Sequence, residues 1–351
     1  MNIYYDNIVF SLQKSGGIST YWGELSRRLI YRGENVQFLE CINNNVINNS
    51  INIDPKLIIN EKRYPFLINR FNNAKSPLFH NKFIFHSSYN RLSKNKNALS
   101  IITVHDLIHE KMFNGLKKRI HCWQKEKAIK NADRIIVVSE NTKNDLIEYY
   151  PYINNDKINV VYNGVSEHYY PIPGIKISKN KNKPYLIYVG SRVNYKNFDF
   201  VLHLLQILLD FNLYIVGPNL SKKEIYLLQK LLPDRWKQFN NVSNIELNFL
   251  YNGAYALIYP SSYEGFGIPL LEAMKCGIPF VALNRSSIPE VAGKAGILVN
   301  DLNIFDFKDA IMSIDLQRES LIQNGYIQVK KFSWDKCFEE TYNIYKELYK
   351  I

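Results

Sequence analysis

The feature that most constrains the fold is a short apolar run followed by a glycine turn and a second apolar segment. Tyr255–Tyr259 predicts a buried strand, and a helix is expected to begin behind the turn and to stop at Gly277. Gly265 and Gly267 flank Phe266 where the strand gives way to the helix. Such a turn lets backbone N–H groups approach a ligand closely, and the helix directs the positive end of its dipole at that ligand. The segment therefore predicts an α/β unit with an anion-binding turn.

Two carboxylates lie on either side of this turn. Glu264 precedes it, and Glu272 lies inside the predicted helix, eight residues further on. A ligand whose phosphate is held at the turn could therefore meet one acid at each of its ends. The alternative interpretation is a strand, a turn and a helix that carry two surface acids.

The residues around these acids extend the pattern to Pro-Ser-x-x-Glu-Gly-Phe-Gly-Ile-Pro-Leu-Leu-Glu-Ala-Met over residues 260–274. This run, with its Glu-x7-Glu spacing, resembles the donor site of the retaining glycosyltransferases of family 4. Within that family, the stretches Tyr188-Val-Gly-Ser-Arg192 with Tyr195-Lys-Asn197, and Gly17-Ile-Ser-x-Tyr21, look most like bacterial mannosyltransferase-like enzymes of surface polysaccharide synthesis. The resemblance covers nearly the whole chain and is weakest over residues 41–82. It implies the GT-B fold, an α/β architecture in which two Rossmann-like, doubly wound domains face a central cleft.

A chain of 351 residues with 46% hydrophobic residues exceeds one ordinary core and predicts two domains. The resemblance implies a Rossmann-like acceptor-binding domain over residues 1–170 and a Rossmann-like nucleotide-sugar-binding domain over residues 184–331. Residues 171–183, which contain proline, glycine and several lysines, are expected to be the linker. Residues 332–351 are expected to form a helix that crosses back onto the first domain.

The first half opens with a strand at Ile3–Tyr5, a loop that ends in Gly16-Gly17, and a helix, which is how a doubly wound domain begins. In the family this glycine loop approaches the donor diphosphate, whereas Gly-Gly before a helix can also be a simple turn. His105 follows the predicted strand Ile101–Val104, at the edge where open α/β sheets bind ligands. A histidine there can donate a hydrogen bond, titrate near neutrality, or be a packed core residue. The resemblance places His105 near the donor sugar.

The second half opens with a predicted strand at Tyr185–Gly190, and Gly-Ser-Arg-x-x-x-Lys-Asn follows over residues 190–197. The family carries a matching signature. Arg192 offers a planar fork of donors and Lys196 a point charge, and both suit phosphate oxygens. The alternative interpretation is two surface cations.

Three other stretches carry predictions of secondary structure alone. The asparagine-rich residues 41–60 are interpreted as a surface excursion. Residues 218–240 are expected to form one helix, and Ile245–Leu250 to precede a helix around Tyr251–Ala254.

A nucleotide-diphosphate sugar leaves negative charge on its diphosphate, and the site must stabilise that charge. The resemblance gives this role to Arg192, Lys196, the loop at Gly16 and Gly17, and the backbone N–H groups of Gly265, Phe266, Gly267 and Ile268. It implies that Glu264 holds sugar hydroxyls, that Glu272 accepts from ribose hydroxyls, and that His105 lies near the reacting face. The chain contains no Asp-x-Asp, so we expect no metal on the diphosphate and no cofactor. Retention is implied by the resemblance, and a front-face substitution is expected because no recognised carboxylate is an obvious glycosyl nucleophile.

The resemblance implies a glycosyltransferase that moves mannose or a related deoxysugar from a nucleotide-diphosphate donor, expected to be GDP-linked. The acceptor is expected to be a glycan or an undecaprenyl-diphosphate-linked oligosaccharide in bacterial O-antigen, lipopolysaccharide or capsule synthesis. One alternative is a nucleotide-sugar epimerase with the GT-B fold. A second is a non-enzymatic scaffold that binds anionic lipid or glycan.

The net charge of +12 is concentrated in one window, because residues 61–130 hold 15 Lys and Arg against 4 Asp and Glu. Such a patch attracts an anionic membrane or a phosphorylated acceptor, and nucleic acid is disfavoured because no recognised binding motif accompanies the charge. Basic and apolar residues alternate over residues 61–82, a pattern that can lie on a membrane interface; the alternative is a solvated lysine-rich face.

We expect a cytoplasmic protein, peripherally associated with the inner face of the membrane. Asp6 and Asn7 interrupt the first apolar run, so no signal peptide is predicted, and no apolar stretch is long enough to span a bilayer. The four cysteines lack metal-type spacing and are expected to be reduced thiols.

Overall fold

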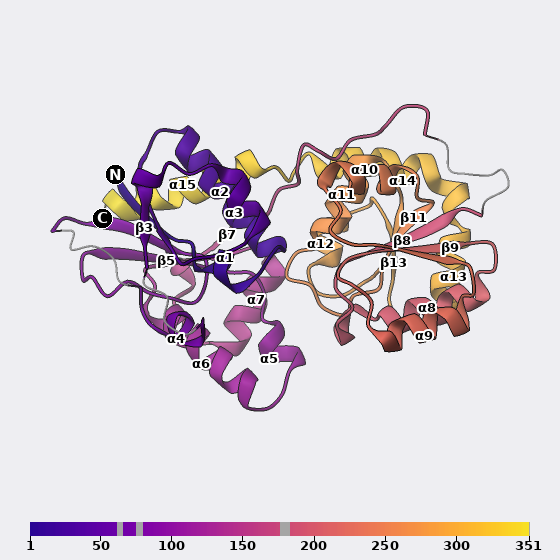
Figure 1. Ribbon diagram of the computed structural model, residues 1–351, viewed down its shortest axis with the longest axis horizontal. Helices are drawn as coiled ribbons and strands as arrows, with labels where there is room; N and C mark the ends of the chain where they lie inside the picture. The colour runs from indigo at the N-terminus through magenta and orange to yellow at the C-terminus, as the bar shows by residue number, and fades with distance from the viewer. Residues whose placement is uncertain (62–65, 75–79, 176–182, 351) are drawn as a thin grey trace. The chain divides into compact units, whose positions relative to one another are not determined.

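The computed structural model describes residues 1–61, 66–74, 80–175 and 183–350 (Figure 1). The chain divides into two compact units. Unit 1 comprises Met1–Gly164 and Trp334–Ile351, and unit 2 comprises Val165–Ser333. The first boundary therefore falls at Gly164, a few residues before the expected position of 170. Residues 176–182 of the expected linker lie outside the described residues.

Unit 1 is built on a sheet of seven parallel strands in the order β3-β2-β1-β4-β5-β6-β7. The strands are β1 Asn2–Asp6, β2 Asn35–Glu40, β3 Ile58–Asn60, β4 Phe83–Ser87, β5 Ala98–Val104, β6 Arg134–Val137 and β7 Ile158–Val160. The chain winds outward from β1 to β3 and then in the other direction from β4. This reversal between β1 and β4 makes the sheet doubly wound, with a ligand-binding crevice expected where the carboxyl ends of these strands diverge.

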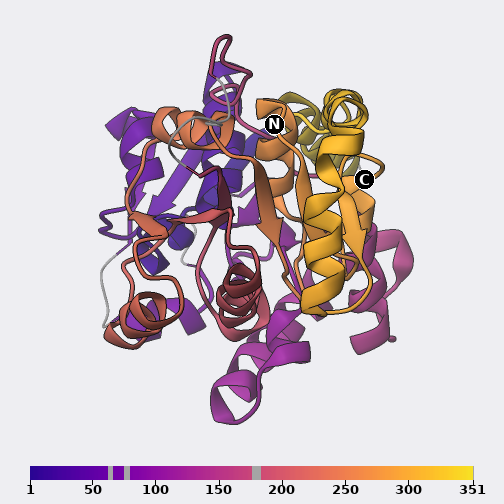
Figure 2. The ribbon, with the colours of Figure 1, turned by 90° about the vertical axis from the view of Figure 1, so that its right-hand side faces the viewer.

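The helices of unit 1 connect these strands and cover the sheet (Figures 1 and 2). They are α1 Ile8–Leu12, α2 Gly17–Tyr31, α3 Val46–Ile51, α4 Phe66–Phe71, α5 Ile108–Met112, α6 Leu116–Asn131, α7 Glu140–Tyr149 and α15 Trp334–Lys350. Helix α15 is anchored in the core of unit 1, because the Tyr345 hydroxyl lies 2.8 Å from the Tyr5 hydroxyl and also contacts Nδ1 of His86. Arg28 of α2 adds an ion pair of 2.7 Å to Asp335 of α15.

The asparagine-rich residues 41–60 are more integrated than a surface excursion. They contain α3 and the edge strand β3, which pairs in parallel with β2. Asn45 is fully buried: its side chain accepts from the backbone N–H groups of Ile47 and Asn48 at the start of α3. The asparagines indicate a loop by composition, but at this position one of them caps a helix.

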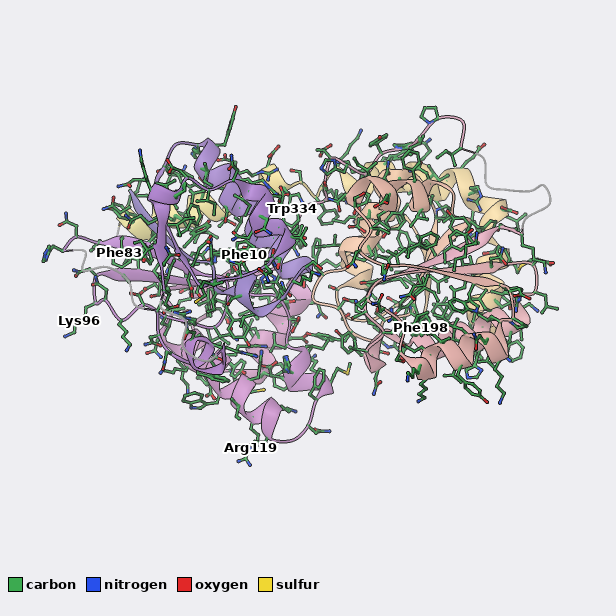
Figure 3. The ribbon with its side chains drawn as sticks, viewed as in Figure 1. Phe10, Phe83, Lys96, Arg119, Phe198 and Trp334 are labelled. Atoms are coloured by element: carbon green, nitrogen blue, oxygen red, sulfur yellow. The ribbon has the colours of Figure 1, made fainter. Side chains whose placement is uncertain are left out.

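Unit 2 repeats the plan with six parallel strands in the order β10-β9-β8-β11-β12-β13. The strands are β8 Tyr185–Val189, β9 Asn212–Val216, β10 Trp236–Phe239, β11 Ala256–Tyr259, β12 Phe280–Leu283 and β13 Ile297–Val299. The helices are α8 Phe198–Ile207, α9 Lys222–Leu231, α10 Asn244–Asn252, α11 Ile268–Cys276, α12 Ile288–Ala292, α13 Ile304–Met312 and α14 Ile314–Val329. Phe198 and the aliphatic residues of α8 pack on this sheet as part of the core (Figure 3). The expected α/β class and the paired doubly wound domains are therefore confirmed.

Two predictions of secondary structure in unit 2 were wrong. Residues 218–240 form α9 and then strand β10 rather than one helix, because Pro233 follows the helix and cannot continue it. The next helix, α10, begins at Asn244 rather than near Tyr251. Ser243 and Glu246 form a reciprocal capping box there, which fixes the start of the helix ahead of the apolar run.

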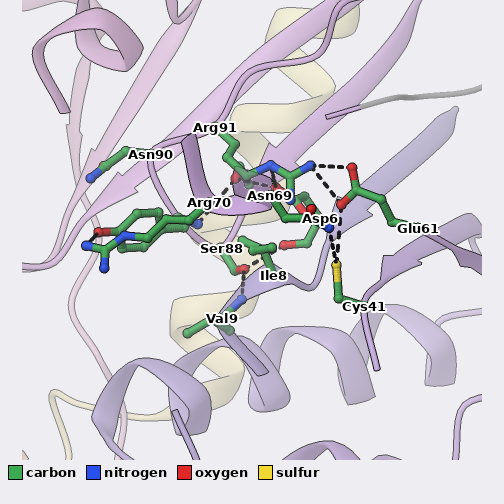
Figure 4. Close-up of polar contacts among 12 residues, drawn as sticks. Asp6, Ile8, Val9, Cys41, Glu61, Asn69, Arg70, Ser88, Asn90 and Arg91 are labelled. Carbon is green, nitrogen blue, oxygen red and sulfur yellow. Dashed lines mark hydrogen bonds and ion pairs between the residues drawn. The ribbon is translucent and has the colours of Figure 1, made fainter. Parts of the chain in front are cut away.

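A buried ionic cluster in unit 1 centres on Arg91, just beyond β4 (Figure 4). Its guanidinium Nη2 lies 2.9 Å from Oε1 of Glu61, and its Nε lies 3.4 Å from Oδ2 of Asp6 at the end of β1. The side chains of Arg91 and Asp6 are each 1% exposed. Burial raises the pKa of the Asp6 carboxyl, and the charge of Arg91 opposes that shift. Because Arg91 joins the ends of two central strands to the segment after β3, we interpret the cluster as part of the scaffold.

Candidate functional site

In unit 2, the best-defined contact between predicted site residues joins Lys196 to Glu264. The Lys196 ammonium lies 2.9 Å from Oε1 of Glu264, and the side chains are 15% and 14% exposed. Lys196 follows β8, and Glu264 follows β11, so the pair links the two strands at which the winding of the sheet reverses. This is the position at which open α/β sheets bind their ligands.

The loop after β8 and the loop after β11 are tied together beside this pair. The Asn197 side-chain amide donates to the Pro260 carbonyl and to the Ser262 hydroxyl, both at 2.7 Å. The Ser262 backbone N–H donates to the Tyr195 carbonyl at 2.8 Å. These bonds hold the two loops in fixed register, so the cation and the carboxylate are positioned by backbone rather than by their mutual attraction alone.

Arg192 is held by three hydrogen bonds and keeps one guanidinium nitrogen without a partner. Its Nε donates to Oε1 of Glu224 at 2.6 Å, and its Nη2 donates to the carbonyls of Pro218 and Asn219 at 2.8 Å each. The side chain is 5% exposed, and Nη1 is buried without a hydrogen-bond partner. An unpartnered guanidinium nitrogen is costly to bury, so this donor is suited to an anionic ligand.

Gly217, at the end of β9, allows this arrangement of Arg192. A Cβ at Gly217 would lie 2.3 Å from the Gly190 carbonyl oxygen and 3.4 Å from Nη1 of Arg192. The backbone φ of 157° is also one that side-chain-bearing residues rarely adopt. A larger residue would therefore separate the loops that follow β8 and β9 and displace the guanidinium.

The glycine turn before α11 is held by two serines. The Ser286 hydroxyl accepts from the Glu264 backbone N–H at 2.8 Å, and the Ser287 hydroxyl donates to the carbonyls of Glu264 and Phe266 at 2.9 Å. Gly267 then begins α11 with a φ of 110°. Ser286 and Ser287 were not predicted as site residues; the structure shows that they fix the turn that contains Gly265.

Glu272 lies on α11, and its partners are tyrosines. Its Oε2 accepts a hydrogen bond of 2.8 Å from the Tyr251 hydroxyl of α10. Burial raises the pKa of the Glu272 carboxyl, and hydrogen bonds from Tyr251 and Tyr169 oppose that shift. The Tyr169 ring also packs edge-on against Tyr251 at 5.9 Å between centroids. Tyr251 and Tyr169 were not predicted as site residues, since nothing in their sequence context distinguishes them from core aromatics.

In unit 1, the expected glycine loop and His105 are connected through α2. Gly16 has a φ of 153° and precedes α2, which begins at Gly17. One turn into the helix, the Tyr21 ring packs edge-on against His105 at 4.9 Å between centroids. The glycine loop and His105 therefore belong to the same end of the sheet of unit 1, as the topology predicts.

His105 differs from the expectation of a group that titrates near neutrality. Burial, together with the positive charge of Lys125, lowers the pKa of His105 to about 4. Lys125 is itself fixed by its 2.9 Å contacts with the Asp106 carbonyl and Oε2 of Glu110. The imidazole is therefore neutral at physiological pH and suited to hydrogen bonding rather than to carrying charge. Among the described residues, no three His, Cys, Asp or Glu side chains converge so as to hold a metal ion.

Comparison with protein families matches both halves of the chain. Residues 15–169 match the model described as Glycosyltransferase Family 4, and residues 175–328 match the model described as Glycosyl transferases group 1. The first match contains Gly16, Gly17 and His105, and the second contains every site residue predicted in unit 2.

Known relatives agree with these matches. O-antigen chain mannosyltransferase B of Escherichia coli is 30% identical over 268 residues, which cover 71% of this chain and 68% of that protein. O-antigen chain mannosyltransferase RfbU of Salmonella typhimurium is 28% identical over 206 residues, covering 57% of this chain and 56% of that protein. Among solved structures, sucrose-phosphate synthase from Thermosynechococcus elongatus superposes with a TM-score of 0.79 at 17% identity, covering 99% of both chains. The chain therefore belongs to the glycosyltransferases that join a family 4 domain to a group 1 domain in the GT-B fold.

Proposed function

We propose that this glycosyltransferase transfers mannose or a related deoxysugar, with retention of configuration and without a metal, from a GDP-linked donor. The proposed acceptor is a glycan or an undecaprenyl-diphosphate-linked oligosaccharide in bacterial surface polysaccharide synthesis. The similarity to two O-antigen chain mannosyltransferases supports the sugar and the class of product. The observation that carries the donor site is the Lys196–Glu264 pair together with the unpartnered Nη1 of Arg192.

This pair suggests how the donor would be held. A diphosphate at the turn would attract the Lys196 ammonium and the unpartnered nitrogen of Arg192. Glu264 would then exchange its contact with Lys196 for hydroxyls of the sugar. The two halves of one ion pair would thus bind adjacent parts of one ligand, which couples recognition of the sugar to recognition of the diphosphate.

The chemical step proposed here is a front-face substitution. The bond between the acceptor oxygen and the anomeric carbon forms on the face from which the bond between that carbon and the phosphate oxygen breaks. The departing phosphate oxygen takes the proton of the acceptor hydroxyl. Arg192, Lys196 and the N–H groups of the turn would stabilise the charge that develops on the diphosphate, and neutral His105 would hydrogen-bond the sugar.

Two substitutions test the donor site. Glu264→Ala and Lys196→Ala are each expected to lower turnover at least roughly tenfold, since a lost charge-assisted contact typically costs about 1.5–3 kcal/mol. Lys275→Ala is the matched control: Lys275 is also in unit 2, is 19% exposed, and pairs with Glu167 at 2.6 Å. Turnover near that of the unmodified protein in either test variant, at saturating donor and with an intact fold, would remove the pair from the mechanism.

A screen of nucleotide sugars separates the proposed donor from the rival functions. Slow hydrolysis of GDP-mannose or a GDP-linked relative is expected in the absence of acceptor. Formation of an epimer would identify a nucleotide-sugar epimerase, and no reaction with any donor would favour a binding scaffold. Cleavage of UDP-N-acetylglucosamine alone would keep the transferase but overturn the proposed sugar and base.

A lipid-linked acceptor implies that unit 1 docks reversibly on an anionic membrane. The apolar and basic residues over 61–82 were the predicted contacts, but Lys62, Arg63, Lys75 and Phe79 lie outside the described residues. Arg70 is described, and its guanidinium contacts the Tyr89 hydroxyl and lies 4.8 Å from the centre of that ring. Because Arg70 is only partly exposed and its guanidinium is held against Tyr89, its charge is a poor candidate for a membrane contact.

A further inference from the structure

Helix α6 carries its apolar and polar residues on unexpected faces. Leu116, Ile120 and Trp123 are 70%, 41% and 57% exposed and follow one another at helical spacing along the outer face. The inner face of the same helix buries Gln124 and Lys125 along with Ala128 and Ile129. Isolated exposed apolar residues are ordinary, but an apolar row on a helix that buries a lysine is informative.

The outer row continues into the loop that precedes α6. Met112 and Phe113, at the end of α5, are each 41% exposed. The loop between α5 and α6 and the first turns of α6 extend away from the parallel sheet of unit 1 (Figures 1 and 2), whereas Ala128 and Ile129 near the end of α6 pack in the core. We call the outer residues Met112, Phe113, Leu116, Ile120 and Trp123 the α5–α6 apolar row.

Cations share this outer face with the apolar row. Arg119, near the start of α6, is exposed and points outward (Figure 3), and Lys127 and Lys130 are exposed two and three turns further along the helix. The Lys127 ammonium lies 5.7 Å from the centre of the Trp123 ring. Glu126 lies at the margin of this face and is already paired, with Lys130 at 2.8 Å and with the Tyr152 hydroxyl at 3.0 Å. The face therefore combines apolar side chains with net positive charge.

We propose that the α5–α6 apolar row and its three cations form the surface by which this enzyme docks on an anionic lipid membrane. The inference rests on the proposed function only in that a lipid-linked acceptor requires such docking. Apolar side chains that project from an exposed helix face enter the boundary between headgroups and acyl chains, while neighbouring Lys and Arg remain with anionic headgroups. No helix in the described ranges has the length and apolar character needed to cross a bilayer, and this surface lies along a membrane rather than through it.

The anionic membrane is favoured over two other occupants by the composition of the face. A second copy of the chain would bring the same cations against one another, which opposes symmetric pairing. An acidic protein could match the cations, but it would not need the row of apolar tips on a projecting helix. Trp123 flanked by basic residues is typical of a membrane interface.

Vesicle flotation with the full chain tests the docking surface. Binding to vesicles of phosphatidylcholine with phosphatidylglycerol is expected, with much weaker binding to phosphatidylcholine alone. The combined variant Leu116→Gln, Ile120→Gln and Trp123→Gln should lower partitioning at least roughly tenfold. The matched control changes three exposed apolar residues of unit 2, Phe305→Gln, Leu316→Gln and Ile327→Gln, which are 67%, 92% and 64% exposed, and should bind as the unmodified chain does.

The charge contribution has its own pair of variants. Arg119→Gln, Lys127→Gln and Lys130→Gln together should weaken partitioning roughly a hundredfold at low salt, with a smaller loss at high salt. Lys222→Gln, Lys223→Gln and Lys230→Gln, three exposed lysines of α9 in unit 2, are the control and should leave binding unchanged.

Trp123 supplies a direct readout of insertion. It is the most exposed tryptophan, since Trp22 and Trp334 are buried and Trp236 is partly buried. Acyl-chain-brominated lipid should quench the fluorescence of the unmodified chain, and Trp123→Phe should abolish that quenching while vesicle binding persists. Quenching unchanged by Trp123→Phe would overturn insertion of this row.

The remaining outcomes separate docking from the other occupants and from the donor chemistry. Equal vesicle binding by the apolar-row variant and its unit 2 control would overturn the proposal. So would a loss of self-association in place of a loss of lipid binding, because a second copy would then be the occupant. Donor hydrolysis in solution should be unaffected by every α6 variant, so a failure of docking and a failure of the donor site give different results.

Discussion

Both units are built on a doubly wound parallel sheet, but their buried and partly buried charged side chains differ in how far a ligand could reach them. In unit 1, Arg91 lies between Asp6 and Glu61 with 1% of its side chain exposed, and no ligand from solvent could reach it. In unit 2, Arg192 and Lys196 each have one carboxylate partner, and the Lys196–Glu264 pair remains partly accessible. Both sets lie at the carboxyl ends of strands, so position in the topology does not separate them.

The difference shows that accessibility and the number of carboxylate partners distinguish a scaffold charge from a ligand-directed one, because both arginines leave Nη1 without a hydrogen-bond partner. Lys125 of unit 1 makes the same point, since its ammonium is 2.9 Å from both a carbonyl and a carboxylate and is almost fully buried. Removing a scaffold charge is expected to act on stability, whereas removing a ligand-directed charge is expected to act on activity. The following predictions test that division.

The largest effect is expected from Arg91→Ala. This change leaves Asp6 and Glu61 buried without their cation, which typically costs about 3–5 kcal/mol of unfolding free energy. Arg192→Ala should cost far less stability, because Glu224 is 20% exposed and keeps its hydrogen bonds to Ser221. Urea unfolding followed by tryptophan fluorescence measures both.

A compensating variant sharpens the Arg91 prediction. Arg91→Met combined with Asp6→Asn and Glu61→Gln removes the cation and both charges that need it, so most of the lost stability should return. If the triple variant is as unstable as Arg91→Ala, the cluster stabilises unit 1 through packing rather than through charge.

The second prediction concerns acid, which should destabilise unit 1 selectively. Burial lowers the pKa of His86 from 6.5 to about 3, of His105 to about 4 and of His121 to about 2. The unfolded chain takes up these protons near pH 6.5 and the folded chain does not, so stability is complete above that pH and is lost as the pH falls toward 4. In unit 2, His203 lies on the exposed side of α8 and its ring nitrogen bonds Gln206.

Fluorine NMR of 5-fluorotryptophan-labelled protein can follow each unit during this titration. Trp22, Trp123 and Trp334 report on unit 1, and Trp236 reports on unit 2. Loss of the native Trp22 and Trp334 signals at a higher pH than the Trp236 signal is expected. Simultaneous loss would show that the buried histidines do not set the acid stability of unit 1.

The sequence was sufficient for the fold because its strongest signals are local. Strand, glycine turn and helix recur in both halves, and the order of these units leaves few topologies open. The prediction was wrong between β9 and β11, because the leucines of Leu227–Leu232 indicated a helix that was expected to continue to residue 240. The strand Trp236–Phe239 is a partly exposed edge strand, and an edge strand has too little apolar alternation to be distinguished from a helix.

The sequence pattern predicted which residues belong to the site, but it did not predict which side chains they contact. Arg192, Lys196 and Glu264 stand in a recognisable pattern, yet only folding shows that Lys196 contacts Glu264 and that Glu224, thirty-two residues away, holds Arg192. The exposed row on α6 was missed because apolar residues occur on both faces of that helix and cancel in any periodicity. Long-range pairing and solvent exposure are properties of the packed chain, so the sequence pattern does not contain them.

The third prediction concerns Tyr251, a positioning residue whose hydroxyl donates to Glu272. Tyr251→Phe should raise the KM for donor roughly three- to tenfold with little change in kcat, because one hydrogen bond to a charged group is lost. That bond lowers the pKa of Glu272 against the effect of burial, so its loss should move the acid limb of the KM profile to higher pH.

A matched tyrosine gives the control for this prediction. Tyr185→Phe also removes a hydroxyl of unit 2, one that donates to the Leu250 carbonyl at 2.7 Å, and it should leave the pH profile in place. An unchanged acid limb in Tyr251→Phe would mean that Glu272 does not titrate in donor binding.

The smallest effect is expected from metal removal, and this prediction asks whether the charges of unit 2 suffice for the diphosphate. The chain has no Asp-x-Asp, and Arg192 and Lys196 offer a fork of donors and a point charge beside the turn before α11. Two cations and the backbone N–H groups of a helix start can stabilise a leaving diphosphate. Transfer should therefore continue at an unchanged rate in EDTA, and added Mg²⁺ or Mn²⁺ should not raise it. The variant Lys196→Ala makes the test stricter, because a metal ion from solution could then replace the cation that the protein has lost. Partial recovery of activity with Mg²⁺ in that variant alone would show that Lys196 normally binds the diphosphate. Loss of transfer by the unmodified chain in EDTA, with recovery in Mn²⁺ or Mg²⁺, would show that the cations of unit 2 are insufficient by themselves.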